Sequence, residues 1–243
     1  MQDGRYQDLF PPHPDEYLTD ALQLLELVED KADCVLHATI GILLDPVIIG
    51  LQVANHHGSD EFAAPGLLLD GLSPRGQKVI CEDVSVVSFT KRAQDIAAGA
   101  DYLRALPAID PNRIGAVGLS HGGSGALRAA RERSGAKAAG LQAIVAYYPW
   151  CPRQAAPLAT DVLILIGEAD DWTPAQRCID LLEQYEKLEG RRPMVKVYPQ
   201  ATHAFEVRAP DRLDFGHPEK FHPTAAADSF ASTRQFLDQR LRY

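Results

Sequence analysis

From about residue 66 onward, the chain alternates short aliphatic runs with longer amphipathic stretches. Each aliphatic run is bounded by glycine, proline or aspartate, which is typical of strands buried on both faces of a parallel sheet. The five predicted strands span residues 67–70, 113–117, 141–147, 162–166 and 194–198. The alternation predicts an α/β fold with a mostly parallel central sheet that is flanked by helices on both faces.

Apolar residues at helical spacing mark the helices between these strands. One face is formed by Ile96, Ala100, Leu103 and Leu106. A second helix is predicted from Thr173 as N-cap and Pro174 as first helical position to a stop at Gly190. Its apolar face comprises Cys178, Leu181, Leu182, Tyr185 and Leu188.

The final helix is predicted to begin with Thr224 as its cap and to present Phe230, Leu237 and Leu241 on one face. Residues 208–223 contain three prolines and no periodicity, so we predict a surface loop before that helix. Near the N-terminus, residues 14–31 have a helical pattern, and residues 34–37 are a candidate buried strand. Periodicity does not decide between strand and helix over residues 40–64.

The length and the absence of repeats or a long linker favour a single domain over residues 1–243, with 1–65 as the less regular part. Apolar residues make up 46% of the chain, which is enough for a buried core. The net charge of −9 disfavours a nucleic-acid-binding protein, because phosphate binding needs a basic surface. We expect a monomer or a homodimer.

The sequence also bears on compartment. Without a signal-peptide pattern or an apolar run long enough to span a bilayer, we expect a cytoplasmic protein that binds no membrane. The four cysteines form no C-x-x-C pair. Cys151 and Cys178 are candidates for a disulfide only if their Cα atoms approach within about 7 Å, and an intracellular setting favours free thiols.

The most informative motif is Gly118-Leu119-Ser120-His121-Gly122, a G-x-S-x-G between a predicted strand and a predicted helix. In this context the chain turns sharply, glycines relieve the crowding, and the serine hydroxyl is exposed where the strand ends. The helix N-terminus beside it favours developing negative charge. We therefore interpret Ser120 as a candidate nucleophile; a glycine-rich turn with an incidental serine is the alternative.

A serine nucleophile needs an adjacent base, and two later segments supply candidates. Asp170 and Asp171 follow a predicted strand and Gly167, where either carboxylate can reach the carboxyl edge of the sheet or cap the next helix. His203 follows the last predicted strand and is the histidine best placed to act as base. The chain order of serine, aspartate and histidine is that of α/β-hydrolases.

Taken together, the segments 118–123, 167–174 and 203–205 resemble the dienelactone hydrolase family, with support from 69–76 and 110–114. The resemblance implies an α/β-hydrolase domain without a cofactor, and it selects Asp170 over Asp171 as the triad acid. Well-known dienelactone hydrolases carry a cysteine nucleophile. With Ser120 in that position, the chain resembles the broader group of dienelactone hydrolase-like esterases.

The backbone N–H of His121 is one predicted oxyanion donor, and Ala38 or Thr39 is a candidate for the second. Trp172 is a candidate pocket wall or a core residue. Arg75 is a candidate for binding a substrate carboxylate, with loop structure or a surface ion pair as the alternative. The adjacent His56 and His57 are poor candidates for metal ligands, and we predict no metal site.

These observations predict a serine hydrolase that cleaves small-molecule esters or lactones through an acyl-enzyme on Ser120, with His203 and Asp170 completing the triad. A peptidase-type α/β-hydrolase is the alternative within enzymes. A non-catalytic α/β-hydrolase relative that acts as a binding module is the alternative outside them.

Overall fold

The computed structural model of the chain describes residues 40–43, 66–77, 80, 83–107, 109–133 and 140–241. The predicted helix at 14–31 and the predicted strand at 34–37 lie outside the described residues. So do the second oxyanion candidates Ala38 and Thr39 and the pair His56 and His57. Within the described segments, no helix is both long and apolar enough to cross a membrane.

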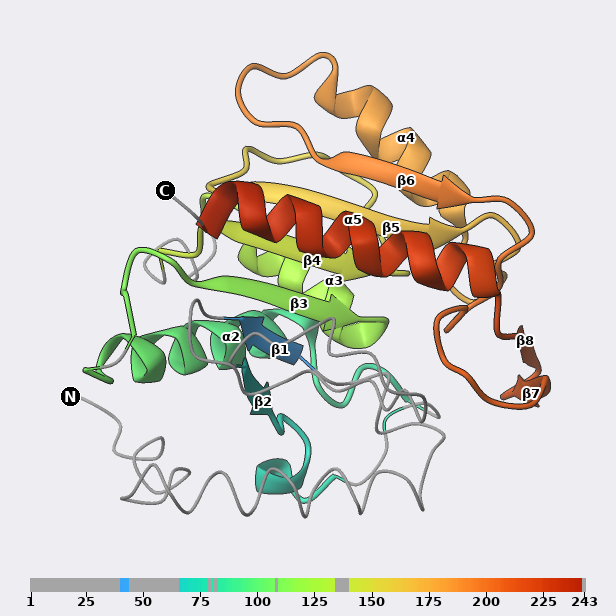
Figure 1. Cartoon of the computed structure of the whole chain (residues 1–243), viewed down its shortest axis with the longest axis horizontal. Helices are drawn as coiled ribbons and strands as arrows, with labels where there is room; N and C mark the ends of the chain where they lie inside the picture. Colours follow the sequence, from blue (N-terminus) through green and yellow to red (C-terminus); the bar gives the residue numbers. More distant parts are fainter. Residues whose placement is uncertain are drawn as a thin grey trace.

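A six-stranded sheet forms the centre of the molecule, in the order β2-β1-β3-β4-β5-β6 (Figure 1). The strands are β1 (Ile40–Leu43), β2 (Gly66–Leu69), β3 (Gly115–Leu119), β4 (Ala143–Tyr147), β5 (Asp161–Gly167) and β6 (Met194–Tyr198). Strands β3 to β6 pair in parallel, whereas β1 runs antiparallel to both β2 and β3. The prediction of a mostly parallel sheet is confirmed, and each predicted strand is found within two residues of its predicted ends.

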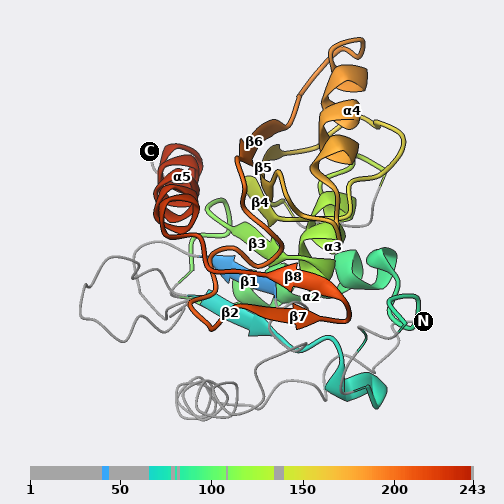
Figure 2. The same cartoon turned by 90° about the vertical axis from the view of Figure 1, so that its right-hand side faces the viewer.

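Helices cover both faces of this sheet (Figure 2). The final helix α5 (Pro223–Leu241) lies on one face. On the other face lie α2 (Phe89–Arg104), α3 (His121–Ala129) and α4 (Ala175–Tyr185). A short 3-10 helix, η3 (Ser73–Arg75), follows β2. This arrangement confirms the predicted α/β-hydrolase fold.

Burial explains why the aliphatic runs form the central strands. Every residue of β4 is buried, as is every residue of β5 after Asp161, so no alternation of polar residues is needed. Strand β6 lies at the edge of the sheet and alternates between more and less exposed positions until Tyr198. The helices complete the core with residues from the predicted faces, such as Ile96 and Ala100 from α2 and Leu237 and Leu241 from α5.

Two predicted helix starts are displaced in the structure. Pro174 rather than Thr173 is the N-cap of α4, because the Thr173 side chain is hydrogen-bonded to Asp170 instead of to the helix. Helix α5 begins at Pro223, one residue before the predicted cap Thr224. There the imidazole Nδ1 of His222 accepts a hydrogen bond from the backbone N–H of Ala225 at 3.2 Å, which is the function expected of a cap.

Residues 208–223, predicted as a surface loop, lie largely at the surface, but the prediction missed the two strands that they contain. This segment forms an antiparallel hairpin of β7 (Arg212–Asp214) and β8 (His217–Glu219), beyond the carboxyl ends of the parallel strands (Figures 1 and 2). Strands of three residues are too short to produce a periodic pattern. The pairing is reinforced by the Arg212 guanidinium, which donates to the buried Glu219 carboxylate at 2.7 and 2.9 Å.

Candidate active site

Ser120 lies between β3 and α3 in a backbone conformation that side chains rarely adopt, with φ 49° and ψ −113°. Its backbone N–H donates to the carbonyl oxygen of Tyr147 at the end of β4 (3.0 Å). The turn leaves no room for side chains nearby. A Cβ at Gly118 would lie 2.4 Å from the Gly122 carbonyl oxygen, and one at Gly123 would lie 2.9 Å from that of Tyr147. The strained turn expected of this motif is therefore present.

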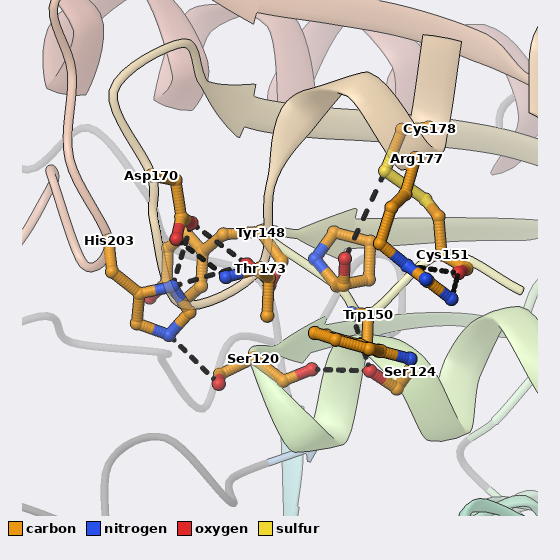
Figure 3. Close-up of a disulfide and its surroundings, with 11 residues drawn as sticks. Ser120, Ser124, Tyr148, Trp150, Cys151, Asp170, Thr173, Arg177, Cys178 and His203 are labelled. Atoms are coloured by element: carbon orange, nitrogen blue, oxygen red, sulfur yellow. Dashed lines mark hydrogen bonds and ion pairs between the residues drawn. A yellow bond between two sulfur atoms is a disulfide. The ribbon is translucent and has the colours of Figure 1, made fainter. Parts of the chain in front are cut away.

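The three residues predicted as nucleophile, base and acid lie in hydrogen-bonding contact (Figure 3). His203 Nε2 is 2.9 Å from Ser120 Oγ, and His203 Nδ1 is 2.7 Å from Asp170 Oδ2. They come from the ends of β3, β5 and β6, separated by up to 83 residues in the chain. His203 and Asp170 are almost completely buried. With Nδ1 donating to the carboxylate, Nε2 is free of its proton and can accept the serine proton.

The Asp170 carboxylate is held by its own loop. Oδ1 accepts hydrogen bonds from the backbone N–H groups of Trp172 (3.0 Å) and Thr173 (2.8 Å). Oδ2, which faces His203, also receives the Thr173 hydroxyl at 2.8 Å. Asp171 points elsewhere and pairs with His217 Nδ1 at 3.0 Å. The strand-end pattern does not distinguish the two aspartates, but the structure does. Asp170 faces His203, whereas Asp171 does not.

Sequence reasoning missed two buried residues, Tyr148, which packs against His203, and Glu206, which is hydrogen-bonded to Tyr148. The Tyr148 ring lies 4.5 Å from the His203 ring, centroid to centroid. The Tyr148 hydroxyl donates to Glu206 Oε1, and burial together with the Glu206 charge raises the pKa of Tyr148 well above its usual value. Tyr148 also has a positive φ of 35°. An acidic residue in the apolar His203-Ala204-Phe205-Glu206 segment was the one available signal.

Cys151 and Cys178 form a disulfide, with their Cα atoms 5.2 Å apart (Figure 3). The expectation of free thiols is therefore wrong for this pair. The bridge joins the segment after β4 to the helix after the acid loop. Arg177 strengthens the same junction by donating to the Cys151 carbonyl oxygen and by lying over the Trp150 ring. Such bridges are commoner in oxidising compartments, so the expected cytoplasmic location stays a prediction.

His121, the predicted oxyanion donor, is the first residue of α3, where a backbone N–H has no acceptor within the helix. Its side chain is buried: Nδ1 accepts from Arg92 Nε, and Nε2 faces the Val84 carbonyl oxygen, both at 3.3 Å. Burial, and then the Arg92 charge, lower the pKa of His121 to about 4. The imidazole is thus neutral at pH 7 and donates from Nε2.

Arg92 is a second residue that sequence reasoning missed. It is fully buried in α2, and its two terminal nitrogens have no hydrogen-bond partner among the residues that the structure describes. Its Nε donates to His121. Beside Lys91 it looks like an ordinary surface arginine, and the available signal was its place four residues before Ile96, on the apolar face of the predicted helix. An unsatisfied buried guanidinium is unusual, and this one lies directly behind His121, the residue that follows Ser120.

The two predicted pocket residues have different positions. Trp172 lies at the site, with its ring 5.1 Å from that of His203. Arg75 forms an ion pair with Asp95, at 2.6 and 3.0 Å, and donates to the Gly71 carbonyl oxygen. For Arg75 the structure therefore shows the ion-pair alternative. Among the residues that the structure describes, no group of histidine, cysteine and carboxylate side chains is arranged to hold a metal ion.

Comparison with known proteins places these residues in a broader context. The model of the dienelactone hydrolase family matches residues 73–241. No curated protein matches the chain in a sequence search. A candidate dienelactone hydrolase from Klebsiella pneumoniae subsp. pneumoniae has a similar structure, with a TM-score of 0.52 and 22% identity over 68% of this chain and 70% of the other.

Two further solved structures share the fold. One is a dienelactone hydrolase-like promiscuous phosphotriesterase from metagenomic libraries, with a TM-score of 0.50 and 21% identity over 66% of this chain and 64% of the other, just under two thirds of its length. The other is an esterase from Thermogutta terrifontis, with a TM-score of 0.50 and 16% identity over 73% of this chain and 70% of the other. At such low identity these similarities describe the fold alone.

Proposed function

The chain belongs to the dienelactone hydrolase family of α/β-hydrolases, and on this premise we propose that it is a serine hydrolase that cleaves carboxylic esters or lactones through an acyl-enzyme on Ser120. The observation that carries the proposal is the continuous hydrogen-bonded series from Ser120 Oγ through His203 to Asp170. Without such a base, a serine hydroxyl is a weak nucleophile at neutral pH.

In the first step, Ser120 Oγ forms a bond to the substrate carbonyl carbon while its proton passes to His203 Nε2. The carbonyl oxygen becomes an oxyanion. When the tetrahedral intermediate collapses, the bond from carbon to the alcohol oxygen breaks, and that oxygen takes the proton from His203 Nε2. Asp170 remains ionised and stabilises the imidazolium that forms between these two transfers.

In the second step, a water molecule gives a proton to His203 Nε2 and attacks the acyl carbon. Collapse returns the proton to Ser120 Oγ and releases the carboxylic acid. For a lactone the alcohol and the acid are one molecule, so the product leaves only after this second step. In both steps the oxyanion lies near the N-terminus of α3, where the His121 N–H and the helix dipole favour negative charge.

A fluorophosphonate probe tests the proposal together with hydrolysis of p-nitrophenyl acetate. We expect the probe to label Ser120 in the folded protein, and Ser120→Ala to lose both the labelling and nearly all of the esterase activity. Ser124→Ala is the matched control, because Ser124 lies one helical turn away and donates to the Ser120 carbonyl oxygen, outside the proton relay. Equal turnover by the wild type and Ser120→Ala would refute the proposal and favour a non-catalytic binding module.

A peptidase-type activity shares the same three residues, so it is distinguished by substrate. The test is a comparison of an ester with the amide of the same acid. Hydrolysis of the amide at a rate close to that of the ester would favour a peptidase. Our proposal predicts a clear preference for the ester, whose alcohol leaves more easily than an amine.

A further inference from the structure

The β7–β8 hairpin is attached to both loops that carry the proton relay. On one side, the backbone of Glu219 in β8 forms a parallel β-bridge with the backbone of His203. Next to it, the backbone N–H of Lys220 donates to the hydroxyl of Thr202 at 2.9 Å. On the other side, His217 pairs with Asp171, the neighbour of Asp170. The tip of the hairpin is therefore held in a defined place beside the site, even though its strands have only three residues each.

Aromatic rings extend from His203 to this tip. The Trp172 ring lies 5.1 Å from that of His203, and it stacks on the His217 ring at 4.8 Å with an angle of 17°. Phe215, at the tip, is 6.2 Å from the Trp172 ring, centroid to centroid. Phe215 is 53% exposed, so its ring presents an open apolar surface two ring contacts away from the histidine.

The backbone at the tip makes a phenylalanine costly there. Phe215 and Gly216 have φ values of 48° and 88°, the combination of a two-residue hairpin turn that favours Asn-Gly or Asp-Gly. A bulky aromatic residue in this conformation is an outlier, and such outliers point to a function of the side chain. Folding does not explain it, because the ring is largely outside the core.

The chemistry of the site determines which part of the substrate contacts the apolar surface of Phe215 and Trp172. His203 Nε2 must reach the alcohol oxygen to protonate it, whereas the carbonyl oxygen lies toward the His121 N–H. The alcohol portion of the ester therefore lies on the His203 side, where Trp172 and Phe215 are, and the acyl portion lies on the other.

We propose that Phe215 and Trp172 form an apolar subsite for the alcohol portion of the substrate, which makes the enzyme selective for esters of aromatic or bulky apolar alcohols. The inference rests on the proposed esterase function. We expect an aromatic contact between the alcohol portion and Phe215 to raise kcat/KM about threefold to tenfold. Because the alcohol leaves before deacylation, the hydrolysis of the acyl-enzyme should not depend on Phe215.

The variant Phe215→Asn removes the ring and creates the Asn-Gly turn that suits the hairpin, so the fold should be at least as stable as that of the wild type. Leu213→Thr is the matched control. Leu213 is an apolar residue of the same hairpin that is 72% exposed and lies opposite Pro218 in the strand pair. Benzyl acetate and methyl acetate are the substrates, since both give the same acetyl-enzyme. Methyl butyrate varies the acyl portion instead.

We expect Phe215→Asn to lower kcat/KM for benzyl acetate about threefold to tenfold, with methyl acetate, methyl butyrate and the deacylation rate changing less than about twofold. Leu213→Thr should leave all of these within about twofold of the wild type. If Phe215→Asn lowers kcat/KM equally for benzyl acetate and methyl acetate, or lowers neither, the proposed subsite is refuted. A uniform loss accompanied by a change in oligomeric state would also overturn it, and would show instead that the hairpin joins two copies of the chain.

The two proposals fail differently. If the wild type and Ser120→Ala hydrolyse every ester equally, the esterase function fails and the subsite fails with it. If hydrolysis depends on Ser120 but the ratio of benzyl to methyl acetate is the same in the wild type and Phe215→Asn, only the subsite is refuted.

Discussion

On one side of Ser120 lies the proposed proton relay of His203 and Asp170, and on the other lies the backbone N–H of His121, the predicted oxyanion donor, with the Arg92 guanidinium behind its side chain. On the relay side, Asp170 receives hydrogen bonds from the Trp172 and Thr173 backbone in addition to His203. On the oxyanion side, Arg92 has two buried nitrogens without a hydrogen-bond partner in the described part of the chain, and His121 is held by two hydrogen bonds of 3.3 Å. The relay is satisfied within its own loops, whereas the oxyanion side carries a buried charge that is only partly compensated.

We expect the two sides to respond differently to pH and to the loss of a contact. Breaking a charge-assisted hydrogen bond between buried groups is costly, because the group left behind has lost its partner. A neutral imidazole buried beside a guanidinium is stable only while it stays unprotonated. We therefore expect the relay side to be sensitive to substitutions of the relay itself, and the oxyanion side to be sensitive to acid.

The largest expected effect comes from Asp170→Asn. The amide keeps the shape of the carboxylate, but its NH2 group can donate to His203 Nδ1, which then carries no proton. The imidazole is protonated on Nε2 instead, which is the wrong tautomer for a base. We expect kcat to fall about 10⁴-fold. Steady-state hydrolysis of p-nitrophenyl acetate measures the loss.

Asp171→Asn is the control for this substitution. Asp171 pairs with His217 at a partly exposed site, so we expect less than about a threefold change. If the two asparagine variants lose activity equally, then the proposal that Asp170 belongs to the relay and Asp171 does not is incorrect.

The second effect concerns the disulfide that joins the two segments around the relay. Reduction, or the double variant Cys151→Ala and Cys178→Ala, opens a loop whose ends are 27 residues apart. We expect the free energy of unfolding to fall by about 3 kcal/mol, which urea denaturation measures. The proton relay does not include either cysteine, so kcat of the folded fraction should change less than about tenfold. A larger loss in kcat at unchanged stability would mean that the bridge positions the acid loop.

The third effect is a loss of stability in acid on the oxyanion side. The pKa of His121 is about 4 in the folded protein, against an ordinary value of 6.5. Between these values the unfolded chain binds the proton and the folded chain does not, so stability contributed by the neutral imidazole is present above pH 6.5 and is lost as pH falls toward 4. The loss amounts to at most about 3 kcal/mol.

His121→Gln isolates this contribution, because the amide can accept from Arg92 and donate to the Val84 carbonyl oxygen but does not titrate. Urea denaturation of both proteins at several pH values gives the difference. We expect the variant to show a shallower decline between pH 6.5 and 4. Parallel curves would show that His121 does not carry the acid sensitivity.

Much of the fold and the relay could be predicted from local patterns. The central strands are continuous aliphatic runs, and Ser120, Asp170 and His203 each follow a strand whose carboxyl end lies at the same edge of the sheet. By contrast, the β7–β8 hairpin has strands of three residues and depends on the distant contacts of Glu219 with His203. The caps of α4 and α5 differ from prediction because Thr173 and His222 have other partners available in the folded chain.

By itself, the sequence of this protein determined the α/β architecture and the family, and it predicted the three residues of the proposed proton relay, because periodicity and short motifs act through neighbours in the chain. The tertiary structure alone decided that Cys151 and Cys178 pair and that Arg92 is buried behind His121. It also decided that the hairpin brings Phe215 to Trp172. These are contacts between segments that are remote in the chain, and their energies depend on distance, burial and charge, which no local pattern specifies.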